Sequence, residues 1–548
     1  MKQLKARGSA LILALVMVIG LLVPAQAAVS QSDVSAAITD TAAYLQNTVS
    51  KPQVGSIGGE WAVLGLARSG YNVPAQYFQD YYSVVEQYVR ERNGILHERK
   101  YTEYSRVIVA LSAIGKDARS VAGYDLTKAL GDFDNTVWQG MNGPIWALIA
   151  LDSAGYPMPN NPSAKTQATR QMYVDYILNK QLSDGGWNLN NGSGESDPDI
   201  TGMALQALAN YQDQTAVASA IQKALACMSK QQNSNGGFTS EESTVQMIVG
   251  LTALGISLDD TRFVKGRNTL LDDLMSYYTK GAGFAHSKDG SGDTLMSTEQ
   301  GLYALVAVQR AQQGKNSLYQ MSDAIKISDS VSTPSQTKPS TQGQGLAGKH
   351  ADVKPVPVTN TSVTFTDIAA NSEAKAISDL ASRNVISGKG NGLFDPNGNV
   401  TRAEFAKIVI GALGLTPKTT TDFTDVPASQ WYAPYVGAAA SYGIVTGVGG
   451  GKFNPNGNIT RQEAAIMVCR AAKLCGISTD MDAASIRNML AQFPDYVSSS
   501  DWARKELAVC YQEGILSQND LDIRPLTPAT RAEITQMVYN LLNRAELL

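Results

Sequence analysis

The stretch Thr401-Arg402-Ala403-Glu404 recurs twice, as Thr460-Arg461-Gln462-Glu463 and as Thr530-Arg531-Ala532-Glu533. In each copy a threonine precedes a glutamate by three positions, and apolar residues follow at helical spacing. This arrangement is typical of a capping box, in which the threonine is the N-cap and the glutamate is the third residue of the helix. The sequence therefore predicts three helices that begin at the three arginines.

The arginine of each copy is unusual, because it stands at the first helical position. A cation there opposes the helix dipole at a cost of about 0.3–1 kcal/mol. An anion bound by the free N–H groups of the helix start and by the guanidinium would explain Arg402, Arg461 and Arg531. Pairing of each arginine with a neighbouring carboxylate would explain them equally well, so the motif leaves both interpretations open.

Each capping box belongs to a longer repeat. The copies open with Phe365-Thr366-Asp367, Phe423-Thr424-Asp425 and Phe493-Pro494-Asp495, and the capping threonine follows after 36 or 37 residues. Between the two motifs lie an apolar helical segment and, in the first two copies, a turn of the form Phe-x-Pro-x-Gly. Self-similarity at this period predicts a series of small helical units.

These units resemble the surface-layer homology (SLH) domains of Gram-positive cell-envelope proteins, with units expected at 361–420, 421–480 and 490–548. The resemblance implies a pseudo-three-fold helical bundle whose grooves bind an anionic, pyruvylated secondary cell-wall polysaccharide. It implies that the binding residues are Arg402, Arg461, Arg531, Asp367, Asp425, Asp495, Trp431, Trp502, Gly388 and Gly447.

The copies differ from the pattern at several positions. Unit one has Glu373 where unit two has Trp431, and unit three has Ser517 where the other units have Gly388 and Gly447. We therefore expect Arg461, in the most complete unit, to contribute more to polysaccharide binding than the arginine of unit three.

A second repeat occupies residues 28–327. Gln181-Leu-Ser-Asp-Gly-Gly-Trp187 is echoed by Gln232-Asn-Ser-Asn-Gly-Gly-Phe238 and more faintly by Gly281-Ala-Gly-Phe284, and each copy precedes an apolar helical segment. A period of about 45–54 residues with two helices per unit predicts a closed helical ring. The expected fold is therefore all-α, with a linker at residues 328–360, which are rich in Ser, Thr, Pro and Gln, before the C-terminal units.

The Gln-x-x-x-Gly-Gly-aromatic loops are similar to prenyltransferase and squalene-oxidase repeats. This resemblance implies an α/α-toroid, as in the terpenoid cyclases, but a fold does not identify a function. The stretch Asp197-Pro198-Asp199-Ile200-Thr201 resembles the Asp-x-Asp-Asp-Thr acid motif of squalene-type cyclases, with Ile200 in place of the third aspartate.

Helix capping offers a structural explanation of Asp197 and Asp199. The same acid-x-hydroxyl pattern occurs at Glu103 and Glu242, and a recurring feature at helix starts favours a structural role. We therefore expect no cyclase activity towards squalene-like substrates, and Asp197 and Asp199 are the catalytic candidates to be tested. Cys227 and His286 lack an adjoining acid-x-Cys motif, so we expect no zinc site, no other metal and no cofactor.

Composition and the first residues indicate export. The chain of 548 residues has 45 basic and 49 acidic side chains, a balance that excludes a general nucleic-acid binder. Lys2, Lys5 and Arg7 precede an apolar run at 10–23 and the small-x-small triplet at 25–27, which predicts a signal peptide at residues 1–27 and no membrane span after its cleavage.

Together these features predict a secreted protein of the Gram-positive cell wall. Its SLH units would attach non-covalently to secondary cell-wall polysaccharide, and its ring would bind a ligand in the central cleft. The alternatives are a surface enzyme of the toroid class, acting on carbohydrate or isoprenoid, and a structural surface-layer component. Paired carboxylates in the ring would favour the enzyme. A wide apolar funnel would favour a protein that binds a lipid or cofactor, and a filled ring centre would favour the structural role.

Overall fold

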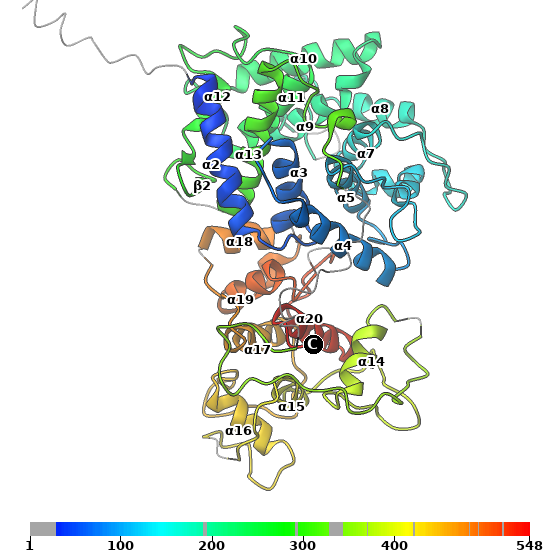
Figure 1. Cartoon of the computed structure of the whole chain (residues 1–548), viewed down its shortest axis with the longest axis vertical. Helices are drawn as coiled ribbons and strands as arrows, with labels where there is room; N and C mark the ends of the chain where they lie inside the picture. The colour runs from blue at the N-terminus through cyan, green and yellow to red at the C-terminus, as the bar shows by residue number, and fades with distance from the viewer. Residues whose placement is uncertain are drawn as a thin grey trace, which may run out of the picture.

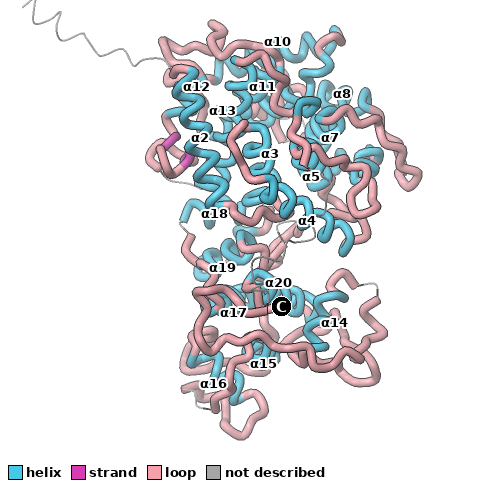
Figure 2. Tube along the Cα trace, in the orientation of Figure 1, coloured by secondary structure: helices cyan, strands magenta, loops and turns pink. Residues whose placement is uncertain are grey.

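The computed structural model describes residues 29–548 except for 190–193, 291–293, 328–342, 370, 420–421, 482, 492 and 518–519. Within the described residues the fold is helical, as Figure 2 shows, and the named strands are the two-residue pair β1 (Tyr278–Thr279) and β2 (Gly283–Phe284). The expected all-α class is confirmed. The predicted signal peptide lies outside the described residues.

Six of the described helices form the inner wall of the N-terminal domain. Around this wall α3 contacts α5, α5 contacts α7, α7 contacts α9, α9 contacts α11, α11 contacts α13, and α13 returns to α3. The circuit closes, which confirms the predicted α/α-toroid. The six helices are α3 (Trp61–Arg68), α5 (Thr102–Ala113), α7 (Asn142–Ser153), α9 (Pro198–Leu208), α11 (Glu241–Ala253) and α13 (Thr294–Gln312).

Outer helices cover this wall. α2 packs on α13 and α3, α8 on α7, α10 on α9 and α12 on α11. Between successive inner helices the chain returns along the outside of the ring. The inner helices therefore run in one direction and begin at the same end of the ring. The outer helices are α2 (Gln31–Thr48), α4 (Ala75–Glu91), α6 (Phe133–Thr136), α8 (Arg170–Asn179), α10 (Thr215–Gln231) and α12 (Leu270–Met275).

Short helical turns complete the described secondary structure. They lie at chain reversals before or after the longer helices. They are η1 (Ser56–Glu60), η2 (Leu126–Gly131), η3 (Val137–Gln139), η4 (Ala209–Tyr211), η5 (Met321–Asp323) and η6 (Tyr496–Ser498).

The glycine-rich loops identified in the sequence hold the starts of three inner helices. A Cβ atom at Gly186 would lie 2.5 Å from Ser196 Oγ, so only glycine allows the loop to pass this closely. The following aromatic residue donates its backbone N–H to a buried threonine hydroxyl of the helix. These donors and acceptors are Trp187 and Thr201, Phe238 and Thr244, and Phe284 and Thr298, at 2.9–3.2 Å.

The C-terminal region is a bundle of three two-helix units. The second helices of the units, α15, α17 and α20, contact one another, while α16 packs on α15, α19 on α17 and α14 on α20. The first helix of each unit therefore lies on the second helix of the preceding unit in a cyclic order. The units comprise α14 (Ala374–Ser382) and α15 (Arg402–Ala412), α16 (Ala433–Ser441) and α17 (Arg461–Leu474), and α19 (Asp501–Gln512) and α20 (Arg531–Arg544).

The segment 343–360, predicted as linker, instead lies along this bundle. Gly345 N–H donates to Glu546 O at 2.9 Å, His350 N–H donates to Leu474 O at 2.7 Å, and Val353 is fully buried in the bundle core. The composition of the segment did not predict this packing, because few apolar residues are needed. One buried valine and backbone hydrogen bonds suffice to hold an extended chain on an existing surface.

The ring sits directly on the bundle. Figure 1 shows α18 (Ala483–Ala491) and α19 beneath α2 and α3. Lys51 Nζ pairs with Glu546 Oε1 at 2.7 Å, Lys100 Nζ donates to the carbonyl of Asp520 at 2.5 Å, and Leu295 packs against both cores. Since Leu295 is in the first turn of α13, the bundle contacts the end of the ring at which the inner helices begin. No helix in the described part of the chain has the length and apolar character that crossing a membrane requires.

Candidate functional site

The arginines of the capping boxes reach across to the next unit. Arg402 Nε donates to Phe453 O at 2.8 Å, and its Nη1 pairs with Glu463 Oε1 at 2.8 Å. Arg461 likewise pairs with Glu533 at 2.7 Å and with Asp520 at 3.4 Å. Both arginines are buried. Of the two interpretations that the motif left open, the structure supports pairing with a carboxylate for these two residues.

The helix starts themselves are also occupied. The backbone N–H of each arginine and of the residue after it donates to carbonyls in the turn of another unit, and the capping threonine accepts the third N–H. An anion therefore does not find free N–H groups at these three helices. The bonds from the arginines run from Arg402 to Gly457, from Arg461 to Thr527 and from Arg531 to Gly398, at 2.8–3.0 Å.

Arg531 differs from the other two arginines. Its Nε donates to Phe394 O at 2.8 Å and its Nη2 donates to Ser387 O at 2.7 Å. Its guanidinium carbon lies 4.4 Å from the centre of the Phe394 ring. Among the described residues it forms no ion pair with a carboxylate, so its charge is neutralised less completely than that of the other two.

The opening aspartates form hydrogen bonds with the turn of their own unit. Asp367 accepts the backbone N–H groups of Phe394 at 2.9 Å and Asp395 at 2.7 Å, and these donors hold the pKa of its carboxyl below the ordinary value. The residue at the position of Asp395 has a positive φ in every unit. The opening aspartate of the unit stabilises this conformation by accepting the backbone N–H of that residue. Asp425 and Asp495 hold Phe453 and Ile523 in the same way, at 2.8 Å.

The predicted aromatic residues are on the surface, whereas the predicted glycines are structural. Trp431 is 53% exposed and Trp502 is 60% exposed. Lys407 Nζ lies 5.8 Å from the ring centre of Trp431. A Cβ atom at Gly388 would lie 2.6 Å from Leu393 O, and one at Gly447 would lie 2.5 Å from Lys452 O. The two tryptophans are therefore the members of the predicted set whose side chains are exposed.

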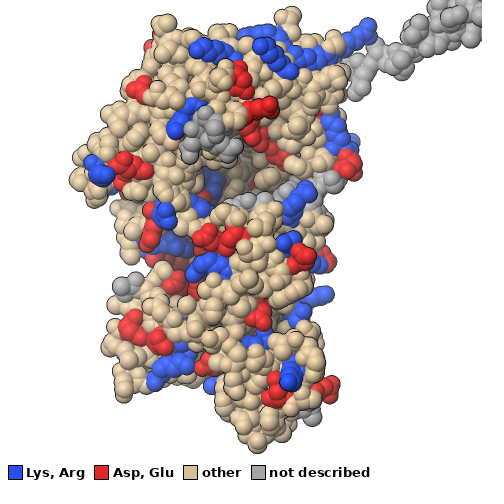
Figure 3. Space-filling view, turned by 180° about the vertical axis from the view of Figure 1, so that it is seen from behind, with Lys and Arg blue, Asp and Glu red and all other residues tan. Residues whose placement is uncertain are grey.

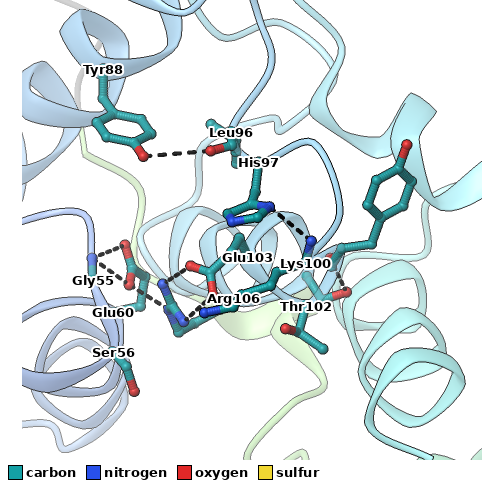
Figure 4. Close-up of polar contacts among 12 residues, drawn as sticks. Gly55, Ser56, Glu60, Tyr88, Leu96, His97, Lys100, Thr102, Glu103 and Arg106 are labelled. Carbon is teal, nitrogen blue, oxygen red and sulfur yellow. Dashed lines mark hydrogen bonds and ion pairs between the residues drawn. The ribbon is translucent and has the colours of Figure 1, made fainter. Parts of the chain in front are cut away.

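In the ring, the starts of α3 and α5 share a closed polar network, which Figure 4 shows. Arg106 Nε pairs with Glu60 Oε2 at 2.7 Å, and its Nη2 pairs with Glu103. Gly55 N–H and the Tyr81 hydroxyl also donate to Glu60, at 3.0 and 3.1 Å. Burial raises the pKa of Glu60, and Arg106 opposes that shift. The network has hydrogen-bond partners for each of its charges.

The two aspartates of the predicted acid motif have different roles. Asp197 is the N-cap of α9, because its Oδ1 accepts the N–H groups of Asp199 at 2.8 Å and Ile200 at 3.2 Å. Asp199 is not a cap. Its carboxyl is partly buried, its Oδ1 has no hydrogen-bond partner in the described part of the chain, and burial raises its pKa to about 6. Capping therefore explains Asp197 but leaves Asp199 unexplained.

Two glutamates of α11 lie beside Asp199. Glu242 Oε2 is 2.8 Å from His286 Nδ1, and Glu242 Oε1 accepts a hydrogen bond from Ser297 Oγ at 2.7 Å. Glu241 is fully buried, and neither of its carboxyl oxygens has a hydrogen-bond partner among the described residues. Burial raises its pKa well above the ordinary value, and the negative charges of Glu242, Asp199 and Asp273 add to that shift. We call Asp199, Glu241, Glu242 and His286 the acid cluster.

Sequence reasoning missed Glu241 and counted Glu242 as evidence for a structural role. In a linear array a recurring acid at helix starts is most simply a helix-dipole partner. In a closed ring the same recurrence brings the acids of neighbouring inner helices to one end. The repeat itself was the signal that could have located the cluster.

The inner wall next to the acid cluster is polar and aromatic. Gln206 Nε2 donates to Gln246 Oε1 at 3.0 Å, and Gln246 Nε2 donates to the Tyr303 hydroxyl at 2.9 Å. Trp61 and Trp146 pack with ring centres 5.0 Å apart. Such a lining disfavours an isoprenoid chain and suits a ligand with hydrogen-bonding groups.

Two further features bear on cofactors. In the described ranges no group of three His, Cys, Asp or Glu side chains is placed to hold a metal ion. The four cysteines, Cys227, Cys469, Cys475 and Cys510, are buried thiols without disulfides.

A cavity of about 230 Å³ lies at the other end of the ring, at the C-terminal ends of α5 and α7. Its lining includes Lys116, Tyr156 and Met321.

Comparison with known proteins identifies the C-terminal units. The S-layer homology domain family matches residues 364–406, 422–465 and 492–535. The exoglucanase XynX of Acetivibrio thermocellus is 32% identical over 36% of this chain and 18% of that protein. The surface-layer 125 kDa protein of Lysinibacillus sphaericus is 31% identical over 29% of this chain and 13% of that protein. The chain thus spans less than a fifth of the length of these relatives.

Solved structures resemble the ring weakly. A type II terpene cyclase from Scytonema covers 51% of this chain and 98% of its own, with 14% identity and a TM-score of 0.36. The unsaturated glucuronyl hydrolase of Bacillus sp. GL1 covers 53% of this chain and 99% of its own, also with 14% identity and a TM-score of 0.36. The closed circuit of inner helices, rather than these scores, defines the ring as a toroid. The chain therefore carries three SLH domains within residues 364–535, C-terminal to an α/α-toroid.

Proposed function

We propose that this cell-surface protein is anchored non-covalently by its SLH domains to an anionic, pyruvylated secondary cell-wall polysaccharide. The observation that carries the proposal is the presence of three SLH domains, a type of domain that binds cell-wall polysaccharide. The exposed rings of Trp431 and Trp502 support it, because aromatic faces stack on sugars and are otherwise unfavourable on a surface.

Within the bundle, we propose Arg531 as the principal contact for the anionic group. Arg402 and Arg461 each pair with a carboxylate of the next unit, whereas Arg531 binds backbone carbonyls. A guanidinium that is not neutralised internally attracts an external carboxylate more strongly. This reverses the order expected from sequence, which favoured Arg461 because unit two keeps its full motif.

Sedimentation with purified cell walls tests the anchoring. The chain without residues 1–27 should sediment with sacculi that retain their polysaccharide, and stay in solution with sacculi stripped of it. Sacculi that lack only the pyruvyl groups should bind at least about tenfold more weakly, the loss expected for one charge-assisted contact. Equal binding to complete and stripped sacculi would overturn the proposal.

We propose further that the toroid binds a ligand at the end where the inner helices begin. The acid cluster and the polar and aromatic wall beside it support this placement. Mass spectrometry of small molecules that stay bound to the native chain tests it. Recovery of one ligand with the wild type, lost when the acid cluster is changed, is the expected result.

A second candidate is a surface enzyme that acts on carbohydrate. Asp199, whose pKa is raised to about 6 by burial, lies near Glu242, and such a pair of carboxyl groups is what general acid–base catalysis uses. Incubation with wall polysaccharide distinguishes the two candidates. Reducing ends released by the wild type and not by Asp199→Asn would establish the enzyme, whereas binding without release supports a receptor.

A further inference from the structure

The acid cluster has more negative than positive charge facing it. Besides Asp199, Glu241 and Glu242, the acids Asp197 and Asp273 lie close by. His286 bonds Glu242, and Lys288 Nζ pairs with Asp273 Oδ1 at 2.5 Å. Tyr277 and Tyr303 also lie near the cluster. Lys288 thus has its own carboxylate, and Glu241 has no cation as a partner among the described residues.

Glu241 is difficult to explain as a structural residue. The N-cap of α11 is Ser240, whose hydroxyl accepts the N–H of Ser243 at 3.2 Å, so Glu241 is not needed for capping. A fully buried carboxyl without a hydrogen-bond partner is unfavourable. Neither of its oxygens has a hydrogen-bond donor among the described residues, and this makes the cluster a candidate binding site.

The surroundings identify the kind of donor. The described residues offer no set of three ligands arranged for a metal ion. A primary ammonium group instead carries one positive charge and three N–H donors. It can donate to both oxygens of Glu241, and its positive charge complements the acids around it.

The cluster reaches the surface along one edge. Asp199 is partly buried, and the side chain of His286 is 28% exposed, whereas Glu241 lies behind them. Figure 3 shows a hollow in the back face of the molecule, above the C-terminal bundle, with acidic side chains at its edge. Resting on the ligand-binding role proposed for the toroid, we infer that the acid cluster binds the protonated primary amine of that ligand.

A primary amine can belong to an amino sugar or to a polyamine, and three probes separate these sources. The tetramer of glucosamine has free amino groups, its N-acetylated counterpart has the same sugar rings without the charge, and spermidine has the charge without the sugar. Calorimetric titration of the chain lacking residues 1–27 compares them. We expect the glucosamine tetramer or spermidine to bind at least tenfold more tightly than the acetylated tetramer.

Proton release gives a second readout that a structural role of Glu241 would not produce. Because burial raises the pKa of Glu241 well above its ordinary value, an ammonium that binds it favours loss of its proton. Titrations in two buffers of different ionisation enthalpy should therefore show release of a substantial fraction of one proton per ligand. Glu241→Gln should abolish this release and weaken binding at least tenfold.

Glu86→Gln is the matched control. It makes the same chemical change as Glu241→Gln on the outer helix α4, outside the acid cluster, so affinity should stay within about twofold. Glu242→Gln, which keeps the shape of a second cluster residue, should also weaken binding, and the melting temperature of each variant shows whether it is folded. The inference would be overturned if neither the glucosamine tetramer nor spermidine bound more tightly than the acetylated tetramer, if none of the probes bound, or if Glu241→Gln left the proton release unchanged. A ligand without an amine, recovered from the native chain, would overturn it while leaving the ligand-binding role of the toroid intact.

Discussion

Replacement of Arg461 tests whether the arginines of the capping boxes stabilise the contact between neighbouring units of the bundle. In the structure Arg461 is buried, pairs with Glu533 at 2.7 Å and donates to Ile523 O at 2.7 Å. Arg461→Ala removes one cation from two carboxylates of unit three, Glu533 and Asp520. The change should therefore loosen the contact between units two and three.

The contacts set the expected size of the effect. Removal of one member of a buried ion pair costs about 3–5 kcal/mol. We expect about 3 kcal/mol, because Arg524 still pairs with Glu533 at 2.6 Å. Arg531→Ala should cost less, about 1–2 kcal/mol, since it leaves backbone carbonyls rather than a carboxylate without a partner.

Hydrogen exchange in increasing urea measures both values in the whole chain. Peptides from α17 and α20 report the free energy of opening of the bundle, separately from the ring. Glu533→Gln keeps the capping box, so the double variant with Arg461→Ala should recover part of the loss. A smaller loss for Arg461→Ala than for Arg531→Ala would refute the assignment of the internal pair.

Four further outcomes follow from the structure. Arg531→Ala should weaken sedimentation with polysaccharide-bearing sacculi about tenfold or more, whereas Arg402→Ala, whose guanidinium is already paired, should weaken it less than threefold. For Asp199 the pKa is raised from 3.8 to about 6, so the folded state holds a proton that the unfolded state loses, and its contribution to stability falls between about pH 4 and pH 6. Asp199→Asn should therefore raise the unfolding free energy at pH 8 by about 2–3 kcal/mol and leave it unchanged at pH 3, and calorimetry that shows the same effect at both pH values would contradict this. Thr201→Val, which removes the buried acceptor of Trp187 N–H, should cost about 1–3 kcal/mol in the thermal unfolding of the ring. Lys100→Glu should weaken the contact with the bundle, and an unchanged radius of gyration in X-ray scattering would show that this lysine does not hold the ring in place.

Much of this protein could be predicted because its signals are local. A capping box depends on residues three positions apart, and Thr401, Thr460 and Thr530 all cap as expected. The glycine-rich loops and their repeat period indicated the ring, since a helical repeat that buries one face must stack on its neighbours. The family resemblance of the C-terminal units was likewise contained in short motifs.

The tertiary structure decided which side chains meet. Arg402 and Glu463 are 61 positions apart and Arg461 and Glu533 are 72 apart, so the bond that neutralises each arginine depends on how the units close around their three-fold axis. The same motif leaves Arg531 without a carboxylate, a difference that no local pattern contains. Closure of the ring also brings Asp199 beside Glu241, because parallel inner helices place their starts at one end. In the sequence Glu241 has no distinguishing feature. In the structure its carboxyl is buried and has no hydrogen-bond partner among the described residues, and from this we infer that the site binds an amine.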